Sequence, residues 1–95
     1  MNVVWTPEAE QDRDDVWLYI ADDNPQAAVR MDELFSSTVA RLSDHPKLGR
    51  PGQIPGTREL IPHKNYRLVY EVDGETVWIL TLIHTAQQWP PLRSS

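Results

Sequence analysis

The chain contains no cysteine, which excludes a disulfide framework, thiolate catalysis and a cysteine-ligated zinc site. It has no apolar run near the roughly 20 residues that span a bilayer, and its N-terminus lacks a signal-peptide pattern. We therefore expect a soluble, unprocessed, cytoplasmic protein without membrane contacts. The histidines have no second ligand at metal-binding spacing and no glycine-rich phosphate loop is present, so we expect neither a metal nor a cofactor.

Basic residues are scarce in the first half of the chain. The 95 residues leave room for one domain, residues 1–95, with a formal net charge of −5. Residues 1–47 hold ten acidic and four basic residues, whereas residues 48–95 hold four acidic and five basic ones. The acidic balance argues against nonspecific binding to nucleic acid, but the second half can present a locally positive face.

Two helices are predicted in the first half by their local start signals. Thr6-Pro7 and Asn24-Pro25 each place a capping side chain before a proline at the first helical position. Apolar residues recur at helical spacing after both pairs. The second helix must end near Asp44, because His45-Pro46 disfavours helical geometry. The short connection between the two helices predicts a helical hairpin.

Strand-forming segments precede and follow the helices. Residues 2–5 form a short β-prone start, and residues 58–61, 66–72 and 76–84 are predicted strands. Asp73-Gly74 is a two-residue hairpin turn signal between the last two strands. The sequence therefore predicts an α+β fold with an N-terminal strand and a two-helix hairpin packed on a mostly antiparallel four-stranded sheet.

The predicted hairpin turn determines which side chains share a face of the sheet. It pairs Tyr70 with Val77, so the apolar residues in phase with them form the face that packs on the helices. Arg67 and His84 then project from the other face, with their backbones about 13 Å apart at about 3.3 Å per residue. We expect a partly apolar, partly cationic binding surface there, which Arg58 joins from the neighbouring strand.

Two arginines and a histidine among strand-forming residues can act on a phosphate. Guanidinium groups bind phosphate and stabilise charge on pentacoordinate phosphorus, and histidine transfers protons near neutral pH. Arg58, Arg67 and His84 would together suffice for metal-free RNA cleavage. Structural roles are the alternative, since arginines pair with acids on sheets, a strand-end histidine is commonly packed, and Trp89 can plug the core. The candidates for binding substrate are Lys64, Arg50 and Trp89.

A series of short segments runs in a recognisable order along nearly the whole chain. They are Trp5–Ala9, Tyr19–Ala21, Asn24–Ala28, Leu42–Pro46, Gly49-Arg50, Gly56–Leu60, Tyr66–Tyr70 and Ile79–Pro90. Together they resemble the RelE/ParE superfamily of bacterial type II toxin–antitoxin toxins, also called plasmid-stabilisation proteins. The resemblance implies a RelE-like fold and a cognate antitoxin that binds and blocks the toxin. It also implies contact with promoter DNA only through the antitoxin complex.

The resemblance leaves two targets for the toxin. In members that cut messenger RNA, an arginine opens the Arg-Leu-Val-Tyr strand and a histidine ends the last strand. Arg67 and His84 match those positions, and Arg58 matches a basic position common to the ribonucleases. The expected function is therefore inhibition of translation by ribosome-dependent mRNA cleavage, as a metal-independent endoribonuclease (mRNA interferase).

The alternatives are a ParE-like, non-enzymatic poison of DNA gyrase and an attenuated member held by its antitoxin. Two departures from the ribonuclease pattern bear on this choice. Thr85 stands where ribonucleases of the superfamily carry a terminal tyrosine, and residues 52–54 contain no equivalent of their loop carboxylate.

Overall fold

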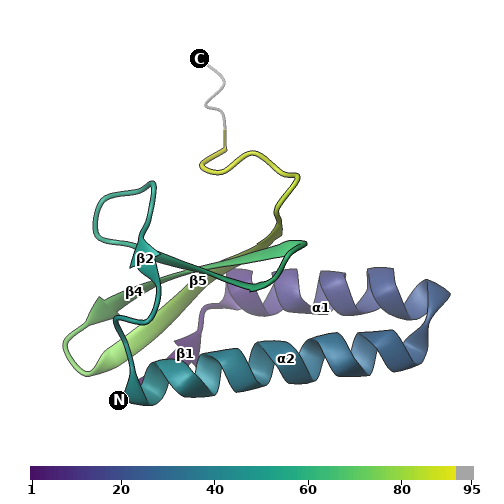
Figure 1. Cartoon of the computed structure of the whole chain (residues 1–95), viewed down its shortest axis with the longest axis horizontal. Helices are drawn as coiled ribbons and strands as arrows, with labels where there is room; N and C mark the ends of the chain where they lie inside the picture. Colours follow the sequence, from purple (N-terminus) through teal and green to yellow (C-terminus); the bar gives the residue numbers. More distant parts are fainter. Residues whose placement is uncertain (92–95) are drawn as a thin grey trace.

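Two antiparallel helices cover one face of a five-stranded sheet (Figure 1). The computed structural model describes residues 1–91. The elements are β1 (Asn2–Trp5), α1 (Pro7–Asp23), α2 (Pro25–Asp44), β2 (Arg50–Pro51), β3 (Arg58–His63), β4 (Tyr66–Asp73) and β5 (Thr76–His84). The strand order is β1-β5-β4-β3-β2, with β1 parallel to β5 and the other neighbours antiparallel.

Both helices begin at the predicted caps. The side chains of Thr6 and Asn24 accept hydrogen bonds from the N–H of the third helical residue, at 3.2 and 3.1 Å. α2 ends at Asp44 as predicted. Arg13 of α1 pairs with Asp32 of α2 at 2.6 Å, which joins the two helices. Within residues 1–91, neither helix is long and apolar enough to span a bilayer.

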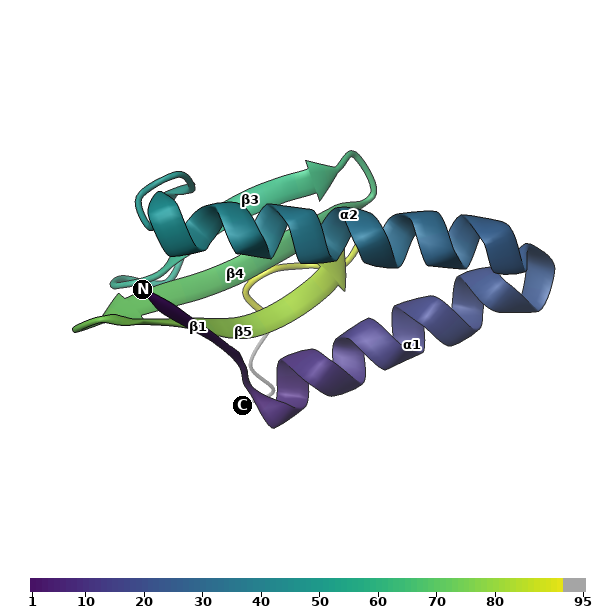
Figure 2. The ribbon, with the colours of Figure 1, turned by 90° about the horizontal axis from the view of Figure 1, so that it is seen from below.

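The hydrophobic core lies between the helices and the inner face of the sheet (Figure 2). The loop that carries β2 and residues 85–91 lie on the outer side, away from the helices (Figure 1). We call these two sides of the sheet the helix side and the outer side. The largest fully buried side chains are Tyr70, Phe35, Leu42, Leu68, Ile79, Val69 and Val77.

The predicted α+β fold is confirmed, but the sheet has five strands rather than four. The additional strand, β2, has only two residues and pairs with β3. The turn between β4 and β5 also differs from the prediction. Its two central residues are Gly74 and Glu75 rather than Asp73 and Gly74. Tyr70 consequently pairs with Ile79 and not with Val77. Gly74 has a φ of +59°, and a glycine at the first central position is the preference of a type II′ turn.

A β-bulge interrupts β5 where β1 no longer borders it. β1 pairs with β5 only as far as Ile79, and the register of β5 with β4 shifts there, which leaves Leu80 without a partner on β4. The Asp12 carboxylate of α1 binds the next two residues through Oδ2. It accepts hydrogen bonds from the Thr81 hydroxyl at 2.8 Å and from the Leu82 N–H at 3.1 Å. The extra residue reverses the alternation of side chains in the rest of β5.

Tyr70 connects the sheet to the chain that leaves α2. Its buried hydroxyl donates to the Pro46 carbonyl and accepts from the Gly49 N–H, both at 2.8 Å. Burial raises the pKa of Tyr70 above its ordinary value of 10.0, although the Gly49 N–H and the nearby Arg58 charge lower it in part. The neutral phenol therefore stabilises the folded state at this junction.

Tyr70→Phe should destabilise the protein by about 2 kcal/mol, because the buried Gly49 N–H and Pro46 carbonyl lose their partner. Tyr66→Phe is the matched control, since Tyr66 is also buried but its hydroxyl makes no hydrogen bond within residues 1–91. Urea unfolding measures both free energies. Equal losses in the two variants would contradict the role of the Tyr70 hydroxyl.

The same hydroxyl should make stability depend on alkaline pH. A raised folded-state pKa means that the contribution of Tyr70 is full below pH 10.0 and is lost as the pH rises through the folded value. We therefore expect the stability difference between the wild type and Tyr70→Phe to shrink as the pH is raised above 10.0. Urea unfolding of both proteins on either side of that pH tests this, and a constant difference would refute it.

Candidate functional site

The sheet separates the residues that were expected to form one catalytic site. His84 pairs with Tyr66 and lies on the helix side, whereas Arg67 pairs with Ile83 and lies on the outer side. The expectation that Arg67 and His84 share a face is therefore wrong. Strict alternation along β5 leads to that expectation, and the extra residue Leu80 reverses it.

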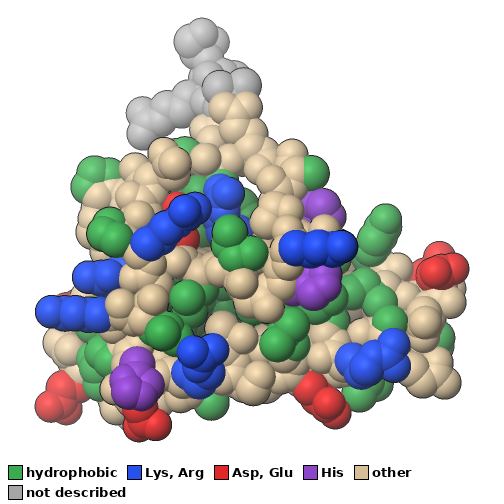
Figure 3. Space-filling model, viewed as in Figure 1, with side chains coloured by type: hydrophobic (Ala, Val, Ile, Leu, Met, Phe, Trp, Pro, Cys, Tyr) green, Lys and Arg blue, Asp and Glu red, His purple; other side chains and the backbone are tan. Residues whose placement is uncertain are grey.

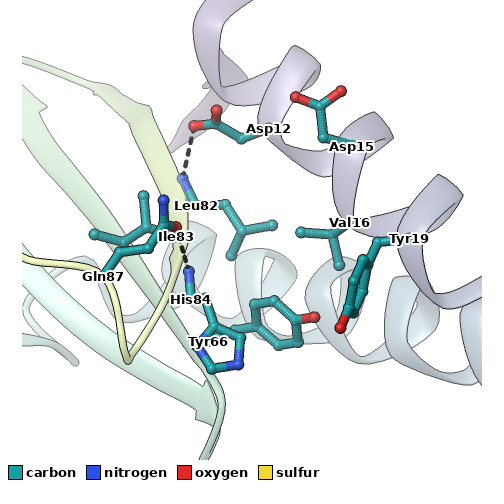
Figure 4. Close-up of a pocket in the computed structure, with 9 residues that line it drawn as sticks. All are labelled: Asp12, Asp15, Val16, Tyr19, Tyr66, Leu82, Ile83, His84 and Gln87. Carbon is teal, nitrogen blue, oxygen red and sulfur yellow. Dashed lines mark hydrogen bonds between the residues drawn. The ribbon is translucent and has the colours of Figure 1, made fainter.

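His84 is held by its local structure at the end of β5. Its ring packs edge-on against Tyr66, with 5.5 Å between the ring centroids. The ring Nδ1 of His84 accepts a hydrogen bond from the backbone N–H of Ala86 at 3.0 Å. The backbone N–H of His84 donates to the side-chain oxygen of Gln87 at 3.1 Å. The ring lies at a cavity of about 480 Å³ between β5 and α1 (Figure 4). Packing and turn formation account for these contacts of His84.

Arg67 neutralises a buried carboxylate on the outer side. Its Nε lies 3.6 Å from Oε1 of Glu59, whose side chain is only 2% exposed. The other oxygen of Glu59 accepts from the Gln53 N–H at 2.9 Å. Arg67 is 19% exposed, and its buried Nε has no hydrogen-bond partner within residues 1–91. A buried acid requires such a partner, so the pair has a structural role whatever else Arg67 binds.

Arg58 joins neither of the other two candidates. It pairs with Tyr70 and therefore lies on the helix side, opposite to Arg67. Its guanidinium donates to the Gly49 carbonyl at 2.7 Å. Tyr66, which faces His84, is four residues away along β4, or about 13 Å at about 3.3 Å per residue. The three residues thus occupy three separate places in the fold.

The expected substrate-binding residues are also dispersed. Arg50 is exposed in β2, and Lys64 is exposed in the turn between β3 and β4. Trp89 is half-buried, and its Nε1 is buried without a hydrogen-bond partner among the described residues. Residues 1–91 contain no group of three or more acidic or histidine side chains that could hold a metal. Roles in catalysis or substrate binding stay predictions for all six candidates.

No role was predicted from the sequence for two acidic side chains, Glu59 and Asp12, that bind residues of the sheet. Glu59 follows Arg58 in β3, and adjacent strand residues face opposite sides, so one of the two charges had to lie on the same side as Arg67. Asp12 occurs between Ala9 and Val16 at helical spacing, which places it on the stripe that faces the sheet. These spacings were the available signals for both residues.

Comparison with known proteins gives consistent matches over most of the chain. Residues 3–89 match the family model described as the ParE toxin of the type II toxin–antitoxin system parDE. A putative toxin, Y4kP of Sinorhizobium fredii, is 39% identical over 87 residues, which cover 90% of each chain.

Solved structures agree in fold. A chain from the chromosomal ParDE toxin–antitoxin system of P. aeruginosa superposes with a TM-score of 0.78 at 24% identity, covering 88% of this chain and 95% of that one. A YoeB/ParE toxin from Agrobacterium tumefaciens superposes with a TM-score of 0.64 at 18% identity, covering 88% and 98%.

Arg67→Ala should destabilise the protein by about 2–3 kcal/mol, because Glu59 is then a buried charge without a counterion. Adding Glu59→Gln should recover part of that loss, since the amide oxygen can still accept from Gln53. Arg50→Ala, at an exposed arginine, is the control and should change stability by less than about 0.5 kcal/mol. A double variant no more stable than Arg67→Ala would contradict the ion pair.

Proposed function

This chain belongs to the ParE toxins of type II toxin–antitoxin systems, and we propose that it poisons DNA gyrase by binding rather than by cutting RNA. The toxin is neutralised by a cognate antitoxin in this proposal. Since gyrase acts on the bacterial chromosome, the proposed site of action is the cytoplasm.

The separation of Arg67 from His84 carries the proposal. Cleavage of RNA by side chains alone needs a base, an acid and a phosphate-binding cation within reach of one phosphodiester. Arg67 and His84 lie on opposite sides of the sheet, and Nδ1 of His84 is engaged by Ala86. Thr85 also replaces the terminal tyrosine of the ribonuclease pattern. These observations favour a protein-binding toxin.

The outer side of the sheet is the surface that we assign to target binding. Arg50 contributes positive charge beside it, since the charge of Arg67 is balanced by Glu59, and Trp78 adds a partly exposed aromatic ring. In Figure 3, Lys and Arg side chains gather around β2 and its loop. A mixed cationic and aromatic surface suits protein recognition, in which arginine and tryptophan are common anchor residues.

The proposed antitoxin follows from the kind of system to which the relatives belong. The ParDE chain of P. aeruginosa comes from a toxin–antitoxin system, and its fold extends over most of this chain. A small protein encoded beside the toxin is the expected partner. Its co-expression should restore growth of cells that carry the toxin.

Induction of the toxin in bacteria should produce DNA double-strand breaks and an SOS response while messenger RNA stays intact. The double variant Arg67→Lys/His84→Gln should inhibit growth with a potency within about two-fold of the wild type, because lysine preserves the charge beside Glu59 and no proton transfer is required. Purified wild type should also block supercoiling by gyrase. These measurements follow growth, DNA breaks and gyrase activity.

Circular dichroism of the purified double variant controls for folding. Cleavage of ribosome-bound transcripts by the wild type, lost in a folded double variant, would overturn the gyrase proposal in favour of a ribonuclease. The antitoxin co-expression result is independent of that choice, because either kind of toxin would be neutralised.

A further inference from the structure

A cavity on the helix side of the sheet has no part in the proposed binding of gyrase. It lies where α1 passes the end of β5 and has a volume of about 480 Å³, within the roughly 300–1,000 Å³ of typical ligand clefts. Asp12, Val16 and Tyr19 reach it from successive turns of α1 (Figure 4). The remaining lining residues are Asp15, Tyr66, Leu82, Ile83, His84 and Gln87.

The charge in this cavity is negative and uncompensated. No lysine or arginine lines it, whereas two carboxylates do. Asp12 uses only Oδ2 in its bonds to β5, and Asp15 uses only Oδ1, which accepts from the Gln11 side chain at 2.9 Å. Within residues 1–91, one oxygen of each carboxylate makes no hydrogen bond. Two acceptors are therefore available to a donor that enters the cavity.

The other walls are aromatic and aliphatic. Tyr19 is 78% exposed, and Tyr66 packs against His84 on the opposite wall. Burial and, to a lesser extent, Tyr19 raise the pKa of Tyr66, so its phenol stays neutral. In the view of Figure 4, Val16 and Leu82 add aliphatic surface between the two carboxylates and the two tyrosine rings. Tyrosine faces attract cations, and aliphatic surface favours a hydrocarbon stem.

We propose that this cavity receives an arginine side chain from a basic segment of a partner protein. A guanidinium would pair with the free oxygens of Asp12 and Asp15, while its stem contacts Val16 and Leu82 and extends toward the tyrosine rings. The acidic first half of the chain, with ten acidic and four basic residues, favours a basic partner segment. Anions are disfavoured by the same carboxylates.

The surface beside the cavity fits apolar residues that flank this arginine. Leu18 is 66% exposed next to Tyr19 on α1, and both line an adjoining depression near the turn between the helices. Exposed large apolar side chains at one place commonly mark a contact site for another protein. The inferred partner motif is therefore an arginine between apolar residues. This inference concerns the opposite side of the sheet from Arg67 and holds whichever target the toxin has.

The test is an NMR titration of the full chain with the peptide acetyl-Leu-Arg-Leu-amide. Amide signals of Val16, Leu82 and Ala86 should shift. The peptide in which citrulline replaces arginine has nearly the same shape without the charge, and it should bind at least about five-fold more weakly. Citrulline binding as tightly as arginine, or shifts confined to other residues, would overturn the proposal.

Asp15→Asn should weaken binding of the arginine peptide about five-fold, because one carboxylate of the pair is lost. Asp14→Asn is the matched control: it removes the same charge from α1, but Asp14 lines a different depression, beside Trp5 and Asp32. Thermal unfolding confirms that both variants fold. Equal weakening by the two variants would show only a general charge effect and would overturn the proposed arginine site.

Self-association is a separate outcome of the NMR measurement. Peak broadening that depends on toxin concentration alone would identify a second copy of the chain as the occupant of the cavity, which would also overturn the proposal.

Discussion

The hydrogen bonds that β5 donates to the Asp12 carboxylate determine how the helices and the sheet of this protein fit together. β1 borders β5 only to Ile79, and beyond that residue the strand edge faces α1. Asp12 accepts there from the Thr81 hydroxyl and the Leu82 N–H, while the Thr6 hydroxyl donates to the Ile79 carbonyl at 2.8 Å. A helix thus satisfies backbone groups that a neighbouring strand would otherwise bind. These contacts secure the bulge and bring Leu82 into the core.

The bulge also gives the two sides of the sheet different chemistry. On the outer side, Arg67 balances the buried Glu59 beside the β2 loop. On the helix side, His84 and Tyr66 close an acidic, aromatic cavity against α1. A shift of one residue in β5 would exchange these faces, because side chains alternate along a strand. Two separate surfaces, one with cationic character and one acidic, are the consequence, and we propose that they bind different partners.

Local signals made much of the fold predictable. Thr6-Pro7 and Asn24-Pro25 define the helix starts, since capping depends on residues a few positions apart. The bulge at Leu80 is followed instead by two residues that bind a carboxylate about 70 residues earlier in the chain, and no spacing within β5 reveals it. β2 has two residues and exists only by pairing with β3. Of the residues proposed for catalysis, Arg67 therefore lies on the expected face of the sheet, whereas Arg58 and His84 lie on the opposite one.

The position of the His84 ring is the most direct test of the bulge in β5. Nuclear Overhauser effects measured on isotopically labelled protein should connect the His84 ring protons to the Tyr66 ring, whose centroid lies 5.5 Å away on the helix side. Nuclear Overhauser effects from His84 to the Arg67 side chain, with none to Tyr66, would contradict the placement of His84 on the helix side. They would mean that β5 continues without a bulge and that the two residues share one surface.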